Sequence, residues 1–268
     1  VEYFPLYKSP LAVAPDIRML RTNLKGQVMA EVIVRAREEY EAEDKARYHL
    51  NVFLRLLSLA SRDFKPRISE YVKTASSPLK GDETIPIERT QIILHHSVPE
   101  DQKIRDIGNA SKIFSSIDWL AKKNLWLSLA LDYYNRANER HTAEETLIDC
   151  IVACEALCSR ESIEVGYRLS MRIASLLGKN SRDRDKIRKM IRKAYDERSR
   201  ILHGKKIKEM QTDTYYLRKY LRELLIRCIK LSYKHSREEI IDMLDQSLLS
   251  EPIRKRLRVE STSDGLVD

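Results

Sequence analysis

An arginine and a histidine within a strongly basic segment have side chains suited to breaking a phosphodiester bond. Arg198 and His203 are separated by four residues, and Gly204 follows directly. A histidine can take a proton from a ribose 2′-hydroxyl because its pKa lies near working pH. An arginine remains charged and can donate two hydrogen bonds to the phosphate that the resulting alkoxide attacks. The pair therefore supplies the two residue types that metal-independent cleavage of RNA needs.

The spacing of the pair limits how such a site could form. On one ideal helix the two side chains point about 140° apart, at about 100° per residue. One helix therefore does not make the site unless the backbone departs from the helix near Gly204, whereas two copies meeting across a twofold axis could. On spacing alone a structural interpretation is favoured, in which His203 caps the helix and Arg198 pairs with Asp196 or with an acid on another helix.

The residues around the pair resemble the signature of the HEPN superfamily. The pattern Y-x-x-R-S-x-I-x-H-G, from Tyr195 to Gly204, is most similar to the ApeA-like HEPN branch, and the resemblance extends over Leu125 to Lys234. It implies a helical domain, a homodimer joined through the motif helix, and RNA cleavage without a cofactor. Arg198 and His203 would be catalytic, in phage defence or toxin-like RNA cleavage.

The same resemblance also implies an alternative without catalysis. Many nuclease members have Asn, Asp or His after the arginine, where this chain has Ser199. Serine is common in the ApeA-like branch. A catalytically inactive HEPN module for RNA binding or protein assembly is therefore the alternative, and a structural helical adaptor is a third interpretation.

Two neighbours of the pair could support it. Ser199 lies four residues before His203, so its hydroxyl could orient the imidazole ring as a third catalytic residue. Tyr195 would form a wall of the site or simply pack against another helix.

Glu155 lies inside an apolar helical segment, where a buried carboxylate needs a partner. A core arginine such as Arg168 or Arg172 is the favoured partner. Pairing with the motif residue Arg198, which Glu155 would then orient, is the less favoured alternative.

The positive charge of the chain is concentrated around the motif. Residues 182–208 hold twelve Lys or Arg and four acids, a net +8 of the +9 of the whole chain. Such a run is most often a solvated helix face or a surface for an acidic protein, but it also suits a polyanion such as RNA. The residues expected to bind RNA are Lys193, Arg200, Lys205 and Lys206.

The cysteines indicate a core and no metal site. Cys150, Cys154 and Cys158 recur every fourth residue and form one helical stripe, and Cys228 has apolar neighbours. Structural zinc sites usually combine two C-x-x-C pairs, which this chain lacks. We expect no metal and no cofactor.

The expected fold is mainly α, and α+β overall. Residues 1–102 predict a small α+β unit, 103–250 a HEPN-like helical bundle and 251–268 a loose, basic-to-polar tail. In the first unit we expect an irregular arm at 1–26, strands at 27–36, 67–75 and 84–98, and a helix at 38–61; a helix opening at 27 is the alternative for the first strand. In the second we expect helices at 107–123, 125–140, 142–158, 166–177, 184–202 and 214–232, with a last one from Ser236 to before Pro252.

The chain has no apolar stretch long enough to cross a membrane and no basic-then-apolar signal pattern at residue 1. A cytoplasmic protein is expected, with no membrane partner. The chain starts at Val1 instead of Met, which suggests a piece of a larger parent chain, and a further protein partner is compatible with this composition.

Overall fold

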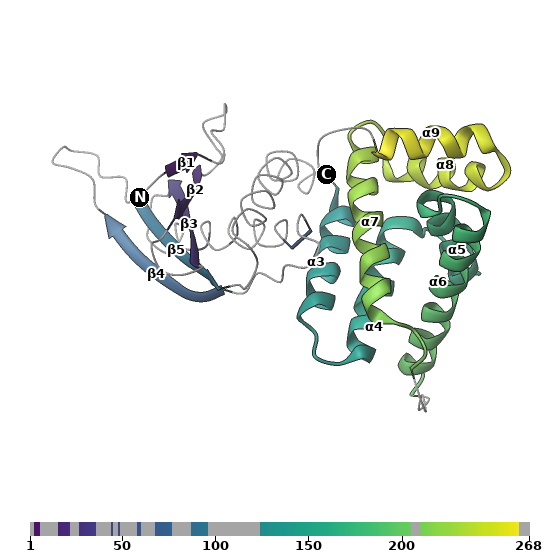
Figure 1. The fold of residues 1–268 in the computed structure, drawn as a ribbon, viewed down its shortest axis with the longest axis horizontal. Coiled ribbons are helices and arrows are strands. Elements are labelled where there is room, and N and C mark those ends of the chain that lie inside the picture. The colour runs from purple at the N-terminus through teal and green to yellow at the C-terminus, as the bar shows by residue number, and fades with distance from the viewer. Residues whose placement is uncertain are drawn as a thin grey trace. The chain divides into compact units, whose positions relative to one another are not determined.

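The computed structural model describes residues 124–204 and 210–262 in full. Before residue 124 it describes the backbone of five strands and the helical residues Asp44, Tyr48, Ser58 and Leu59. The chain divides into two compact units, Val1–Trp119 with Leu266–Asp268, and Leu120–Gly265. Each unit is described by itself (Figure 1).

The first unit contains an antiparallel sheet with the strand order β1-β2-β3-β5-β4. Its strands are β1 (Tyr3–Pro5), β2 (Asp16–Arg21), β3 (Gln27–Arg35), β4 (Ile68–Ser76) and β5 (Ile87–His95).

β3, β4 and β5 lie where the sequence predicts strands, but the expectation of an irregular arm at residues 1–26 was wrong for β1 and β2. Pro5, Pro10 and Pro15 make this stretch look like an irregular arm, but Pro5 and Pro15 are compatible with the two strands. Pro5 ends β1, which is an edge strand where a missing N–H is tolerated, and Pro15 directly precedes β2.

The second unit is a bundle of seven helices within the described residues, and six of them, α3 to α8, lie where the sequence predicts helices. The helices are α3 (Leu125–Glu139), α4 (Ala143–Cys158), α5 (Val165–Leu177), α6 (Ser181–Leu202), α7 (Thr214–Ser232), α8 (Arg237–Leu249) and α9 (Glu251–Thr262). The helix expected at 107–123 lies outside the described residues.

Side-chain caps fix where several helices begin. The hydroxyls of Thr142 and Ser236 accept the backbone N–H three residues later, and Ser236 forms a complete capping box with Glu239. Asn180 accepts the Asp183 N–H in the same way, so α6 begins at Ser181, before the expected start.

α9 replaces most of the loose tail expected after residue 250. Leu257 on α9 is 2% exposed, so this helix has an apolar contact with the bundle. Arg254 donates from Nε and Nη2 to the Ser247 carbonyl oxygen at 3.0 and 2.8 Å. The basic residues that suggested a solvated tail are therefore partly used to satisfy carbonyls at the end of α8.

α4 packs against four other helices of the bundle, α3, α5, α6 and α7. Cys150, Cys154, Cys158 and Cys228 are all at most 1% exposed, which confirms that they are core residues. Burial raises the pKa of the Cys150 thiol to about 12. Among the described residues, no three His, Cys, Asp or Glu side chains are grouped to hold a metal ion.

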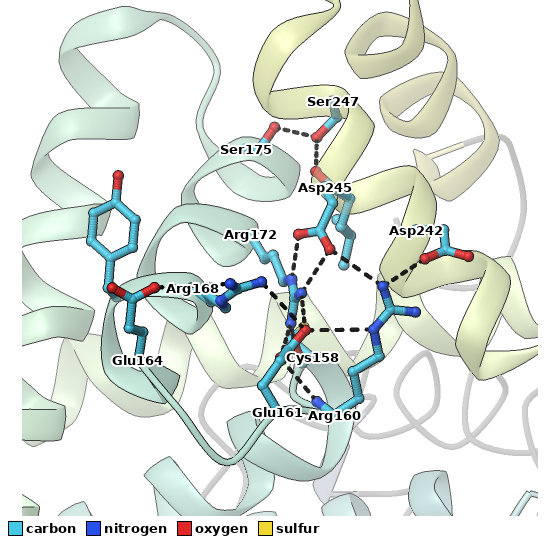
Figure 2. A network of polar contacts seen from close by, with 12 residues as sticks. Cys158, Arg160, Glu161, Glu164, Arg168, Arg172, Ser175, Asp242, Asp245 and Ser247 are labelled. Carbon is cyan, nitrogen blue, oxygen red and sulfur yellow. Dashed lines mark hydrogen bonds and ion pairs between the residues drawn. The ribbon is translucent and has the colours of Figure 1, made fainter.

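An arginine network joins α5 to α8 and to the turn after α4 (Figure 2). The Arg172 side chain is fully buried and donates to both carboxylate oxygens of Glu161 and of Asp245, at 2.5 to 2.8 Å. Its Nη1 also reaches the Cys158 carbonyl oxygen at 2.8 Å. We call these four residues the Arg172 junction.

None of the helices in the described part of the chain has the length and apolar character needed to cross a membrane.

Candidate functional site

The motif occupies the C-terminal end of α6. The His203 N–H donates to the Ser199 carbonyl oxygen at 3.1 Å, so helical hydrogen bonding continues through His203. The chain leaves the helix at Gly204, whose φ of +68° lies in the left-handed region that favours glycine. Gly204 thus ends the motif helix.

Arg198 extends from α6 toward α4. Its Nη2 lies 3.4 Å from Glu155 Oε2, and the guanidinium carbon lies 5.9 Å from the centre of the Tyr195 ring. The side chain is 21% exposed. Its Nε is buried and has no hydrogen-bond partner among the described residues. Arg198 is thus held in place while much of its donor capacity is unused.

The partner of Glu155 is therefore the motif arginine, which was the less favoured alternative. The favoured candidate Arg172 is saturated by the acids of the Arg172 junction. Arg168 instead lies near Glu161 and Glu164, at 3.9 and 3.8 Å.

Partial burial raises the pKa of Glu155 above its usual range, and the nearby positive charge of Arg198 limits that rise. A carboxylate that is costly to ionise and makes one long contact binds its arginine weakly. The pair positions the guanidinium without neutralising all of its donors.

Tyr195 packs directly on Gly166, the second residue of α5. A Cβ atom on Gly166 would lie only 2.8 Å from Cγ and Cε1 of the tyrosine ring. Any side chain there would displace the ring, which lies beside the Arg198 guanidinium. Glycine at this position therefore lets α5 support the motif, a role that the sequence alone did not reveal.

Ser199 and His203 are one helical turn apart, so they lie on the same side of α6. His203 is exposed and Ser199 is half-buried. No hydrogen bond within 124–204 or 210–262 joins the two side chains, so the orienting role of Ser199 stays a prediction.

The structure does not unite Arg198 with His203 in one chain. Because His203 directly follows α6 and keeps the helical hydrogen bond to the Ser199 carbonyl oxygen, the two side chains point about 140° apart. Arg198 is directed toward α4, while His203 is exposed to solvent.

Two of the four residues expected to bind RNA lie within the described residues. Arg200 and Lys193 are exposed, and Lys193 Nζ donates to the Gln211 carbonyl oxygen at 3.3 Å. Lys205 and Lys206 lie outside the described residues.

Glu197, which the sequence analysis counted only as an acid, holds the returning chain against the motif helix. It is 5% exposed and accepts the backbone N–H groups of Gln211 and Thr212 at 3.0 and 3.2 Å. Its position in a basic, solvated-looking segment gave no signal of this role. Glu197 thus fixes the chain that follows the motif onto α6.

No family model, curated protein or solved structure matches this chain. Its function is therefore argued from the end of α6, which combines a partly paired arginine, an exposed imidazole and a basic segment. These groups can bind a phosphate and transfer a proton.

Proposed function

We propose that this chain is a metal-independent endoribonuclease of HEPN type that acts as a homodimer. The observation that carries the proposal is the state of Arg198, which is positioned by Glu155 and Tyr195 while its buried Nε has no partner among the described residues. An unsatisfied buried donor costs about 1–3 kcal/mol. A phosphate oxygen would satisfy this donor and gain a charge-assisted hydrogen bond.

Each active site takes Arg198 from one copy and His203 from the other. The 140° separation along α6 supports this arrangement, because one chain directs the two groups to different sides. His203 removes the proton of the 2′-hydroxyl, and the alkoxide attacks the adjacent phosphorus. The bond to the 5′-oxygen then breaks, His203 returns the proton to that oxygen, and a 2′,3′-cyclic phosphate and a 5′-hydroxyl remain.

Arg198 binds the phosphate throughout and stabilises the extra negative charge in the transition state. Glu155 and Tyr195 are positioning residues that act through Arg198. Ser199 supports His203, and the exposed cations Lys193 and Arg200 attract the RNA backbone.

Exposed apolar side chains near the motif support a second copy as the partner. Leu202, next to His203, is 55% exposed. Ile163 and Tyr167 lie on either side of Gly166 in the sequence, where Gly166 contacts the Tyr195 ring, and they are 75% and 51% exposed. Exposed large apolar side chains of this kind are typical of protein interfaces.

The ion pair between Arg198 and Glu155 favours a second candidate function. An arginine that already has a carboxylate partner is also what an inactive HEPN module would contain. Such a module would bind RNA through the basic helix or serve in protein assembly without cleavage. Phage defence or toxin-like cleavage is the biological setting that the HEPN resemblance implies for the active form.

The test is cleavage of a mixed RNA pool in EDTA by the native chain and by His203→Ala and Arg198→Ala. Cleavage that resists EDTA, leaves 2′,3′-cyclic phosphate ends and disappears in both variants is expected. Asp196→Ala is a matched control, because Asp196 pairs with Arg192 on the outside of the same helix and should leave cleavage unchanged. Salt-dependent RNA binding without cleavage would instead favour the inactive module.

A further inference from the structure

A pocket of about 220 Å³ lies at the junction of α5, α6, α8 and α9, near the start of α6. It is lined by Met171, Ala174, Ser175, Arg184, Asp185, Arg188, Leu248 and Arg254. The motif, by contrast, lies at the other end of α6. The pocket is therefore a feature separate from the proposed active site.

The pocket lining combines two kinds of side chain. Met171, Ala174 and Leu248 provide apolar surface, and Ala174 is only 4% exposed. Three guanidinium groups, from Arg184, Arg188 and Arg254, contribute positive charge, and the Asp185 carboxylate contributes one negative charge. A ligand that fits both parts has an apolar body and an anionic group.

The three arginines differ in how far they are already paired. Arg188 binds Asp185 at 2.8 Å, and Arg254 binds Glu251 at the same distance. The Arg184 guanidinium has neither a hydrogen bond nor an ion pair with any residue of 124–204 and 210–262. Arg184 is thus the cation in this pocket that is available to an anion.

Arg258 on α9 is a further cation near Arg184, and the carboxylates of Asp183 and Glu251 lie near it as well. Burial, followed by the charges of Arg227 and Arg184, lowers the pKa of Arg258 on α9. Arg258 itself donates only to a backbone carbonyl oxygen, that of Lys179. A bound anion would be attracted by both guanidinium groups.

An RNA strand bound at the motif would not reach the pocket along the same side of α6. Arg184 and Arg198 are fourteen residues apart, or about 21 Å along the axis and within about 40° around it. Ile191 lies midway between them on this side and is completely buried. Packed helices therefore cover the direct path, and the pocket needs a ligand of its own.

We propose that this pocket binds a small organic phosphate that carries a flat, apolar ring. The planar guanidinium of Arg184, with Arg188 beside it, matches phosphate oxygens, and the ring rests on Met171 and Leu248. A dry cavity of about 150 Å³ is known to hold benzene, so this pocket has room for one six-membered ring and a phosphate. This inference goes beyond the proposed nuclease function and does not depend on it.

The test is calorimetric titration of the whole chain with phenyl phosphate, in the absence of RNA. Phenol lacks the anion and inorganic phosphate lacks the ring, so each should bind at least about tenfold more weakly than phenyl phosphate. Absence of saturable binding of phenyl phosphate, or equal binding of phenol, would overturn the proposal.

Two substitutions locate the binding. Arg184→Gln keeps the aliphatic carbons next to Gly178 and should weaken phenyl phosphate binding at least about tenfold. Arg188→Gln should weaken phenyl phosphate binding less, because Arg188 is already paired with Asp185. The substitution should leave the fold intact, because this exposed ion pair within one helix contributes little to stability. Arg182→Gln, at an exposed position of the same helical turn, is the matched control and should bind normally. An equal loss of phenyl phosphate binding in Arg182→Gln would indicate general attraction of the anion to a basic helix and would contradict specific binding in the pocket.

Discussion

Arg172 and Arg198 are both at least partly buried arginines of the same bundle, yet their surroundings differ. Arg172 is fully buried, and its donors reach two carboxylates and one carbonyl oxygen, as Figure 2 shows. Arg198 is 21% exposed, contacts one carboxylate oxygen at 3.4 Å and has a buried Nε without a partner among the described residues. The first arrangement is complete without a ligand, whereas the second has donors left for one.

The difference separates a structural arginine from a candidate functional one. A buried charge is tolerated when its partners satisfy it, and removing any of them leaves an uncompensated charge. A partly satisfied arginine costs stability in the free protein and recovers it when an anion binds. Substitutions at the two sites should therefore affect different measurements.

The largest expected effect is on stability at the Arg172 junction. Arg172→Met should lower the free energy of unfolding by about 3–5 kcal/mol, because Glu161 and Asp245 would lose the cation that they share. Urea denaturation followed by circular dichroism measures this change. Arg168→Met, on the same helix but 47% exposed, should cost less than about 1 kcal/mol. A similar small loss in Arg172→Met would show that the junction is not a structural centre.

The second prediction concerns the pH dependence of the same junction. The hydrogen bonds from Arg172 lower the pKa of Glu161 from an ordinary 4.5 to about 2. A lowered pKa means that the ionised form stabilises the fold above about pH 4.5, and this contribution is lost as the pH falls toward 2. With allowance for solvent around this partly exposed carboxylate, the loss is on the order of 2 kcal/mol. Glu161→Gln should flatten the stability curve between these pH values, and an unchanged slope would contradict the assignment.

The third prediction concerns the support beneath Arg198. Gly166→Ala should destabilise the chain by about 1–3 kcal/mol, because the new Cβ overlaps the Tyr195 ring. A double-mutant cycle with Tyr195→Ala measures the coupling, and the alanine at 166 should cost little once the ring is absent. Equal costs in the presence and absence of the ring would exclude this contact as the cause.

The smallest expected stability effect is at Glu155. Because burial raises the pKa of Glu155, its ionised form at neutral pH detracts from stability, and Glu155→Gln should change the free energy of unfolding by less than about 1 kcal/mol. RNA cleavage should nevertheless fall by about tenfold or more, because Arg198 loses the group that orients it. Melting temperature and cleavage rate measured on the same sample separate the two effects. A parallel loss of both would indicate a structural role only.

The helices of the bundle were predictable because their signals are local. Apolar periodicity and caps such as Thr142 and Ser236 lie within a few residues of the boundaries that they determine. α9 was missed because its basic residues looked solvated, although Arg254 satisfies carbonyls at the end of α8. β1 and β2 were missed because nearby prolines are also typical of irregular arms.

The partner of Glu155 could not be chosen from the sequence for a different reason. Arg172 is occupied by Glu161 and Asp245, which lie 11 and 73 residues away along the chain. Only the packing of α8 against α5 decides this competition. The sequence supplies the charged groups, whereas tertiary structure determines which of them meet.

The most direct test of the proposed site mixes two inactive variants. If Arg198 of one copy acts with His203 of the other, dimers formed from Arg198→Ala and His203→Ala chains contain one intact site. After random exchange of subunits, about a quarter of the native cleavage rate in EDTA should return. If mixing restores no activity although the native chain cleaves RNA and the mixed dimers form, the two residues do not act across two copies, and the composite site is contradicted.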